Sequence, residues 1–116
     1  MLVTDDSIFQ RKIVTSILKK KGYLVLEASN GKDALEILVS KKPDLMILDL
    51  LMPEMDGFEV LREAKKTGIE VPIVVLTSDI QESTREMCES LGAMGFVNKP
   101  VDEEILLENV SRILER

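Results

Sequence analysis

The feature that most constrains the fold is a fivefold alternation of short apolar runs with longer amphipathic segments. The apolar runs predict strands at Leu2–Asp5, Tyr23–Ala28, Asp44–Asp49, Pro72–Thr77 and Met94–Asn98. The amphipathic segments predict helices near Ser7–Lys20, Lys32–Lys41, Gly57–Thr67, Gln81–Leu91 and Glu103–Leu114. This alternation is typical of a parallel sheet with helices on both faces. We therefore expect an α/β fold, a three-layer doubly wound (βα)5 sandwich around a parallel five-stranded sheet.

The residues between these segments support the same division. Gly22, Gly68 and Gly92 follow predicted helices, at the position where glycine commonly ends a helix. Asp102 precedes the last helix as a capping residue. The chain of 116 residues is long enough for one hydrophobic core but too short for two. We therefore expect one domain over residues 1–116.

Composition excludes several kinds of chemistry. The chain has no His and a single Cys, which excludes imidazole–thiolate metal sites, Ser-His-Asp catalysis and an internal disulfide. We expect that cysteine, Cys88, to pack within its amphipathic helix. The formal net charge of −6 argues against direct nucleic-acid binding. The sequence shows neither an apolar run of membrane-spanning length nor a secretory signal, so we expect a cytoplasmic protein without a membrane partner.

Polar side chains gather where the predicted strands end. Asp5 and Asp6 follow the first strand, Asp49 ends the third, Thr77 ends the fourth and Lys99 follows the fifth. Each residue alone has an ordinary explanation, such as a helix cap or a solvated cation. In open parallel sheets, however, ligands bind at the carboxyl ends of the strands. We therefore expect these side chains to form one site at that edge of the sheet.

Three carboxylates in one pocket require protonation or a cation. Two unit charges about 4 Å apart repel by roughly 4 kcal/mol at an effective dielectric of 20. Mg²⁺ suits such a site because it takes oxygen ligands and combines one or two carboxylates with waters and a phosphate oxygen. Lys99 and Thr77 offer a cation and a hydroxyl group to a phosphate. Asp49 can then attack phosphorus and form an aspartyl phosphate.

These residues lie in motifs that resemble those of response-regulator receivers of two-component signalling, over essentially the whole chain. The motifs are Asp5-Asp6-Ser7, Leu45-Met46-Ile47-Leu48-Asp49, Met52-Pro53-x-x-Asp56-Gly57, Thr77-Ser78 and Lys99-Pro100. The resemblance implies the flavodoxin-like strand order 2-1-3-4-5. It also implies a switch that accepts a phosphoryl group from a histidine kinase, a histidine phosphotransfer protein or a small phosphodonor. Such a domain catalyses its own phosphorylation and dephosphorylation and is not an enzyme with a separate substrate.

The resemblance also assigns roles to single residues. Asp49 is implied as the phosphoacceptor, Asp6 as a direct Mg²⁺ ligand and Asp5 as a ligand that acts largely through water, while Leu51 contributes its backbone carbonyl. Thr77 and Lys99 are implied to contact the phosphoryl group, Phe96 is implied as the aromatic switch, and the Lys99–Pro100 bond is implied to be cis. The output surface is expected on the fourth helix, the fifth strand and the last helix, facing an effector protein or domain outside this chain. We expect a monomer or a weak homodimer.

Two positions depart from the family pattern, and several alternatives remain. Thr4 stands in the first strand where an apolar residue is common, and the bulky Leu51 stands two residues after the acceptor, where the family tunes the access of water to the phosphoaspartate.

Two alternatives need features that this sequence lacks. A haloacid-dehalogenase-like phosphatase needs a second Asp at the position of Leu51, and a flavodoxin-like cofactor carrier needs a phosphate loop after the first strand. A pseudo-receiver that works by binding alone is a third alternative. A stand-alone regulator, a phosphorelay intermediate and the receiver of a longer protein all share this sequence pattern.

Overall fold

The computed structural model describes residues 1–115. Within them the elements are β1 (Leu2–Thr4), α1 (Ile8–Lys20), β2 (Leu26–Ala28), α2 (Gly31–Lys41), β3 (Met46–Asp49), α3 (Gly57–Lys66), β4 (Ile73–Thr77), α4 (Glu82–Ser90), β5 (Gly95–Asn98) and α5 (Glu103–Leu114). The strands form one parallel sheet in the order β2-β1-β3-β4-β5. The expected α/β class and strand order are confirmed. Among the described residues, no helix has the length and apolar character needed to span a bilayer.

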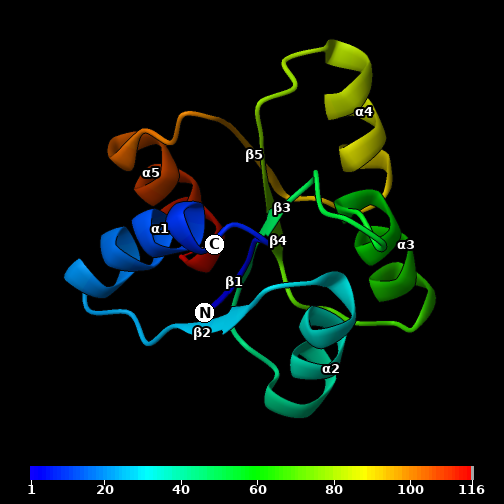
Figure 1. Cartoon of the computed structure of the whole chain (residues 1–116), viewed down its shortest axis with the longest axis horizontal. Helices are drawn as coiled ribbons and strands as arrows, with labels where there is room; N and C mark the ends of the chain where they lie inside the picture. The colour runs from blue at the N-terminus through cyan, green and yellow to red at the C-terminus, as the bar shows by residue number, and fades with distance from the viewer. Residues whose placement is uncertain (116) are drawn as a thin grey trace.

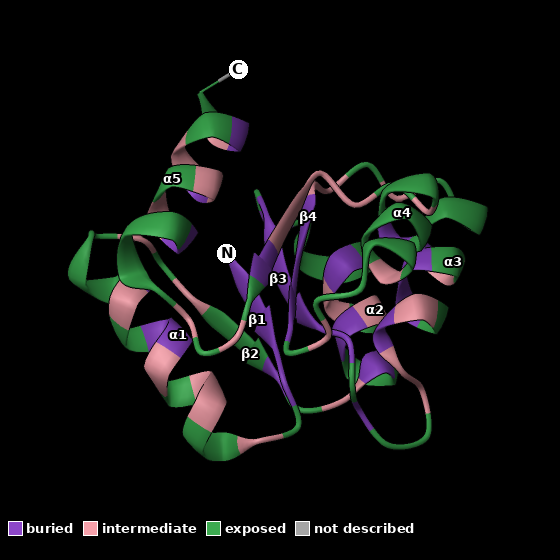
Figure 2. Ribbon diagram, turned by 90° about the horizontal axis from the view of Figure 1, so that it is seen from above, coloured by how far each residue is buried: buried purple, intermediate pink, exposed green. Residues whose placement is uncertain are grey.

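Helices cover both faces of the sheet. α1 and α5 lie on one face, and α2, α3 and α4 lie on the other (Figure 1). Successive residues of a strand point to opposite layers, so Leu48 packs toward α2 and α3 while Ile47 packs toward α1 and α5. β3 and β4 are buried along their whole length, and Figure 2 shows them between the two helical layers. The carboxyl ends of these central strands therefore carry side chains that the fold holds rigidly.

The second strand is shorter than the sequence pattern predicted. β2 begins at Leu26 and not at Tyr23, because β1 has three residues and pairs with three. Tyr23 and Val25 still pack against the core, which explains the apolar pattern that predicted a longer strand. Leu24 between them is 90% exposed, and its carbonyl accepts a hydrogen bond from the amino group of Met1 at 2.7 Å. The other predicted bounds lie within two residues of those in the structure, and those of α5 coincide with it.

The helix ends follow the expected chemistry. Gly22, Gly68 and Gly92 have φ angles of 91°, 75° and 101°, in the left-handed region that favours glycine. Asp102 caps α5, because its Oδ1 accepts a hydrogen bond from the backbone N–H of Ile105 at 3.1 Å. The glycines that follow three helices and the capping residue Asp102 therefore predicted correctly where these helices end and where α5 begins.

Thr4 shows how the central strand accommodates a polar residue. Its side chain is buried in β1, between β2 and β3. The hydroxyl group donates a hydrogen bond to Met46 Sδ at 3.3 Å. The departure from the family pattern at Thr4 therefore leaves no unpaired hydroxyl donor in the core.

Candidate acidic site at the strand ends

Three carboxylates meet beyond the carboxyl ends of β1 and β3. Asp5 and Asp6 follow β1 and Asp49 ends β3, and one carboxylate oxygen of each lies within 4.8 Å of the others. Asp5 and Asp49 are buried, whereas Asp6 is exposed. β1 and β3 are neighbours in the sheet, which places their ends side by side (Figure 1). The structure therefore brings together the acidic group that the sequence predicted.

A lysine ammonium group lies against these carboxylates. Lys99 Nζ is 3.0 Å from Asp49 Oδ1 and 3.6 Å from Asp5 Oδ2. Lys99 follows β5, and its backbone N–H donates to the carbonyl oxygen of Thr77 at 2.8 Å. This bond ties the loop after β5 to the end of β4. The Lys99–Pro100 peptide bond is cis, as the family resemblance implied.

The surroundings of Asp49 raise the pKa of its carboxyl group above the ordinary value. Burial is the largest cause, because it removes water from the charged form. The negative charge of Asp5 raises the pKa further, while the hydrogen bond and the positive charge of Lys99 lower it. A hydrogen bond from the backbone of Leu51 also lowers it. One ammonium group therefore does not fully compensate for two buried carboxylates.

Asp5 is held in place yet keeps one oxygen without a hydrogen bond. Its Oδ1 accepts from the backbone N–H of Ser7 at 2.9 Å, and its carbonyl oxygen accepts from Arg11 Nη1 at 2.7 Å. Among the buried side-chain nitrogen and oxygen atoms of residues 1–115, Asp5 Oδ2 alone lacks a hydrogen-bond partner. Burying such an oxygen is costly, and a set of oxygen donors around it suits a hard cation. The residues present therefore fit Mg²⁺.

The other predicted residues lie at or beside the same edge of the sheet. Thr77 ends β4 and is fully buried, and its Oγ1 accepts a hydrogen bond from the backbone N–H of Asp79 at 3.1 Å. Phe96 lies in β5 and is partly buried, with the Arg85 guanidinium carbon 5.7 Å from the ring centroid. Leu51 follows β3, and its side chain is 65% exposed.

Two further residues shape the site, although the sequence analysis assigned neither of them a role in it. The Arg11 guanidinium group donates one hydrogen bond to the main-chain carbonyl oxygen of Asp5 at 2.7 Å and another to Glu27 Oε1 at 2.8 Å, so it joins α1 to the ends of β1 and β2. Gly57 begins α3, where an added Cβ would lie 2.7 Å from the Cα atom of Leu50. Gly57 was noted as part of a family motif. The contacts of Arg11 could not be predicted from the sequence, because one partner is a backbone carbonyl oxygen and the other, Glu27, lies 16 residues away along the chain. Both residues fix the loops that carry the carboxylates.

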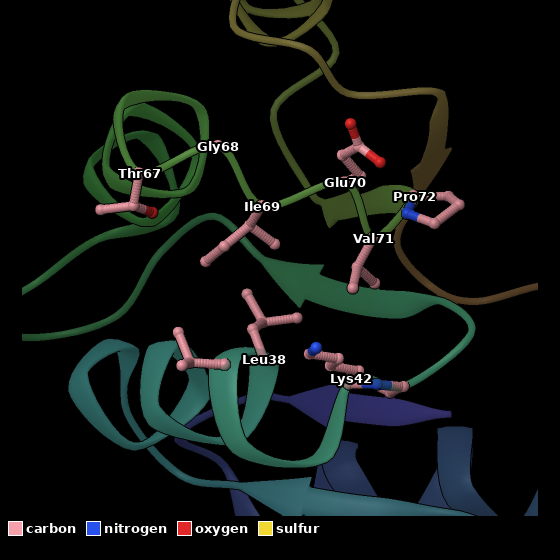
Figure 3. Close-up of a pocket in the computed structure, with 10 residues that line it drawn as sticks. Leu38, Lys42, Thr67, Gly68, Ile69, Glu70, Val71 and Pro72 are labelled. Atoms are coloured by element: carbon pink, nitrogen blue, oxygen red, sulfur yellow. The ribbon is translucent and has the colours of Figure 1, made fainter.

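A separate hollow lies near the opposite ends of the strands. It has a volume of about 490 Å³ and is formed by the segments before β3 and β4, together with the ends of α2 and α3 (Figure 3). Leu38, Ile69 and Val71 give it an apolar lining, and Lys42 lies beside them. The carboxylates follow strands, whereas this hollow precedes them, so it is not part of the acidic site.

Proteins of known sequence are similar to this chain over nearly its whole length. The family described as the response regulator receiver domain matches residues 1–111. Protein PilH of Pseudomonas aeruginosa is 34% identical over 116 aligned residues, which cover 98% of this chain and 96% of PilH. Response regulator MprA of Mycolicibacterium vanbaalenii is 37% identical over 116 residues, and the match covers 100% of this chain and 50% of MprA. The chain therefore spans nearly all of the first relative and half of the second.

Solved structures share the fold. Chemotaxis protein CheY4 of Vibrio cholerae has a TM-score of 0.90 and 33% sequence identity, covering 97% of this chain and 96% of CheY4. The receiver domain of NtrX from Brucella abortus has a TM-score of 0.91 and 30% identity, covering 98% of this chain and 97% of that domain. Sequence and fold agree over almost the whole length, and the chain belongs to the family of response regulator receiver domains.

Proposed function

We propose that Asp49 accepts a phosphoryl group and that this modification switches the domain between two states. The observation that carries the proposal is the position of the Asp49 carboxylate. It is buried at the end of β3, 3.0 Å from Lys99 Nζ and in one cluster with Asp5 and Asp6. A nucleophile held beside a fixed cation, with further acidic groups to hold a metal, is the arrangement that phosphoryl transfer needs. Membership of the receiver family supports the same role.

In the proposed reaction, an ionised oxygen of Asp49 attacks the phosphorus atom of the donor, in line with the leaving group. A P–O bond to Asp49 forms while the donor's P–N bond in phosphohistidine, or its P–O bond in acetyl phosphate, breaks. The electron pair of the broken bond leaves with the donor, so no oxidant or reductant is needed. The Lys99 ammonium group pairs with the phosphoryl oxygens. Attack by water on the aspartyl phosphate reverses the modification, and we assign to Leu51 the control of that water's access.

The chain's own oxygen atoms form the proposed Mg²⁺ site. Asp6 and Asp49 would hold the ion directly, Asp5 largely through water, and Leu51 through its backbone carbonyl. The buried Asp5 Oδ2 without a hydrogen-bond partner supports this assignment, as does the convergence of the three carboxylates. When bound, Mg²⁺ neutralises the carboxylates and polarises a phosphoryl oxygen.

Thr77 and Phe96 form the proposed switch. A phosphoryl group on Asp49 draws the Thr77 hydroxyl group toward it, and the vacated space allows the ring of Phe96 to turn inward. The surface formed by α4, β5 and α5 then changes shape. Phosphorylation can shift this equilibrium only by its differential interaction with the two states, so we expect a partly populated active state beforehand.

The proposed partners follow from this reaction. The donor is a histidine kinase, a histidine phosphotransfer protein or a small phosphodonor, and the target is an effector that contacts α4, β5 and α5. We propose a cytoplasmic monomer or weak homodimer that makes no direct contact with nucleic acid. Family membership sets aside the haloacid-dehalogenase-like phosphatase and the flavodoxin-like carrier. A receiver that works by binding alone is the alternative that the following experiment addresses.

Acetyl phosphate labelling, followed by intact-protein mass spectrometry, tests the proposal. We expect the wild type to gain one phosphoryl group with Mg²⁺ and none with EDTA. Asp49→Ala should gain none, and Asp44→Ala, which removes a carboxylate at the opposite end of β3, should label like the wild type. A wild type that never labels would favour a receiver that works by binding alone. Undiminished labelling of Asp49→Ala would show that another residue is the acceptor.

The switch has its own test. Thr77→Ala keeps the Asp49 nucleophile but loses the hydroxyl group, so it should retain some labelling and lose much of the conformational response. NMR shifts of residues 81–97, recorded with and without the phosphate mimic beryllofluoride, measure that response. A full response in Thr77→Ala would exclude coupling through Thr77.

A further inference from the structure

Helix α4 is attached to the rest of the domain by few groups. Among residues 82–90, Cys88 is the one that is buried. The neighbouring α3 buries four residues over a similar length, namely Gly57, Val60, Leu61 and Ala64. In the described structure the N-cap residue Gln81 makes no side-chain capping bond. An element with so few buried side chains moves at a low free-energy cost.

The first turn of α4 is held by the carboxylate of Asp79. Asp79 Oδ1 accepts a hydrogen bond from the backbone N–H of Gln81 at 2.9 Å, and Oδ2 accepts from the hydroxyl group of Thr84 at 2.7 Å. These two hydrogen bonds lower the pKa of Asp79 below its ordinary value, because they favour the charged carboxylate. Asp79 therefore caps α4 in place of Gln81, from two residues upstream.

The same residue is bonded to the proposed switch. The backbone N–H of Asp79 donates to Thr77 Oγ1 at 3.1 Å. Ile80 is 81% exposed and Ser78 is exposed, so burial does little to hold this segment. Asp79 thus contacts the hydroxyl group of Thr77 with its main chain and the first turn of α4 with its side chain.

We propose that Asp79 is the positioning residue that transmits a movement of the Thr77 hydroxyl group to α4. The inference rests on the proposed function, in which that hydroxyl group turns toward a phosphoryl group on Asp49. The turn takes the acceptor away from the Asp79 N–H, and the exposed segment around residue 79 rearranges. The Asp79 carboxylate keeps its two hydrogen bonds to α4, so the first turn of the helix moves with it.

A second contact links α4 to the aromatic switch. Arg85 lies in α4, and its guanidinium carbon is 5.7 Å from the centroid of the Phe96 ring. Arg85 Nε also pairs with Glu89 Oε1 at 3.1 Å along the same helix. A displaced α4 therefore changes the cation–π contact over Phe96, so the ring and the helix respond together.

The Asp79→Ala variant distinguishes the proposed coupling from Thr77 through Asp79 to α4, called the relay below, from an ordinary helix cap. Asp79→Ala removes both side-chain hydrogen bonds, whereas Asp102→Ala removes a similar capping bond from α5 without any contact to Thr77. Thr84→Val is a milder variant that loses one hydrogen bond and keeps the branched shape of the side chain. Amide shifts are recorded for each protein with Mg²⁺, before and after addition of beryllofluoride.

All three variants should bind beryllofluoride, which the shifts of the Asp49 and Lys99 amides report. In Asp79→Ala, the shift changes over residues 82–90 and at the Phe96 ring should fall about twofold or more, the lower end of the effect expected for a coupling residue. Thr84→Val should give a smaller reduction, and Asp102→Ala should respond over 82–90 as the wild type does.

The outcomes separate the relay from the proposed function. A wild-type response over residues 82–90 in Asp79→Ala would overturn the relay and leave phosphorylation of Asp49 intact. An equal loss in Asp102→Ala would also overturn it, because general destabilisation would then explain the effect. A wild type without any beryllofluoride response at Asp49 and Lys99 would instead contradict the proposed function, and the relay would fall with it.

Discussion

Neutralising Asp6 should stabilise the metal-free protein and weaken Mg²⁺ binding. Asp6 is the exposed member of the carboxylate cluster, and oxygens of Asp5 and Asp49 lie within 4.8 Å of its own. At that separation two unit charges repel by about 0.9 kcal/mol at a dielectric of 80 and by about 3.5 kcal/mol at 20. The lower figure suits an exposed group. The attraction of Lys99 and screening by salt reduce the repulsion that these two neighbours exert on Asp6. We therefore expect Asp6→Asn to raise the free energy of unfolding of the metal-free protein by about 1 kcal/mol.

Thermal and urea unfolding in EDTA, repeated across a Mg²⁺ titration, measure both effects. A gain of about 1 kcal/mol corresponds to a rise in Tm of about 4 °C for a domain of this size. Mg²⁺ at about 100 times its Kd should stabilise the wild type by about 2.7 kcal/mol. The variant should require a higher Mg²⁺ concentration for the same gain.

Asp44→Asn is the matched control, because it removes the same charge from an exposed residue at the opposite end of β3. It should change neither the apo stability by a comparable amount nor the Mg²⁺ dependence. Lower apo stability in Asp6→Asn together with unchanged Mg²⁺ affinity would refute a ligand role for Asp6. An equal gain in Asp44→Asn would attribute the effect to net charge and not to the cluster.

Three further predictions concern single groups. Because the pKa of Asp49 is raised in the folded protein, the folded state binds the Asp49 carboxyl proton more tightly than the unfolded chain does. The free energy of unfolding therefore falls as the pH rises from the ordinary value through the raised pKa, and stays lower at higher pH. In EDTA, the stability advantage of Asp49→Asn should therefore shrink as the pH falls toward the ordinary value of 3.8, and a pH-independent advantage in urea unfolding would contradict this. Burial raises the pKa of the Cys88 thiol to about 11, so iodoacetamide at about pH 8 should modify the native protein slowly and the urea-unfolded chain quickly; equal rates would be inconsistent with a buried thiol. Gly57→Ala places a Cβ 2.7 Å from neighbouring backbone and should cost about 1–3 kcal/mol and slow acetyl phosphate labelling. Gly92→Ala, where the described residues leave open space and the strain comes from φ alone, should cost about 1 kcal/mol and leave labelling unchanged, so equal effects in urea unfolding would rule out the close approach at Gly57.

The pattern of apolar residues along the chain predicted the helices and strands, because that pattern follows from which side chains are buried. β3 and β4 are buried on both faces and read as continuous apolar runs, so their existence and type were plain from the sequence. The start of β2 was not, because Tyr23 and Val25 pack against the core without pairing in the ladder. Strand length depends on the partner strand, and the short β1 limits it.

The carboxylate cluster was predictable in part, because parallel strands end at one edge of the sheet and Asp5 and Asp49 each lie at a strand end. That β1 and β3 are neighbours depends on the strand order, which the family resemblance implied and the sequence pattern alone did not. The two hydrogen bonds from the Asp79 carboxylate to the start of α4 were not predicted, although Asp is a favoured capping residue and Gln is not. Its contact to Thr77 depends on the path of a short loop, which hydrophobic patterning does not encode. The bridge from Arg11 to Glu27 likewise depends on how α1 lies against β2.

Locating the acyl phosphate on the chain tests the central claim most directly. After reaction with acetyl phosphate and Mg²⁺, borohydride reduces an aspartyl phosphate to homoserine, and peptide mass spectrometry identifies the modified position. We expect homoserine at position 49, dependent on Mg²⁺ and absent from a sample treated with EDTA. Homoserine at position 5 or 6 with Asp49 unmodified would contradict the account.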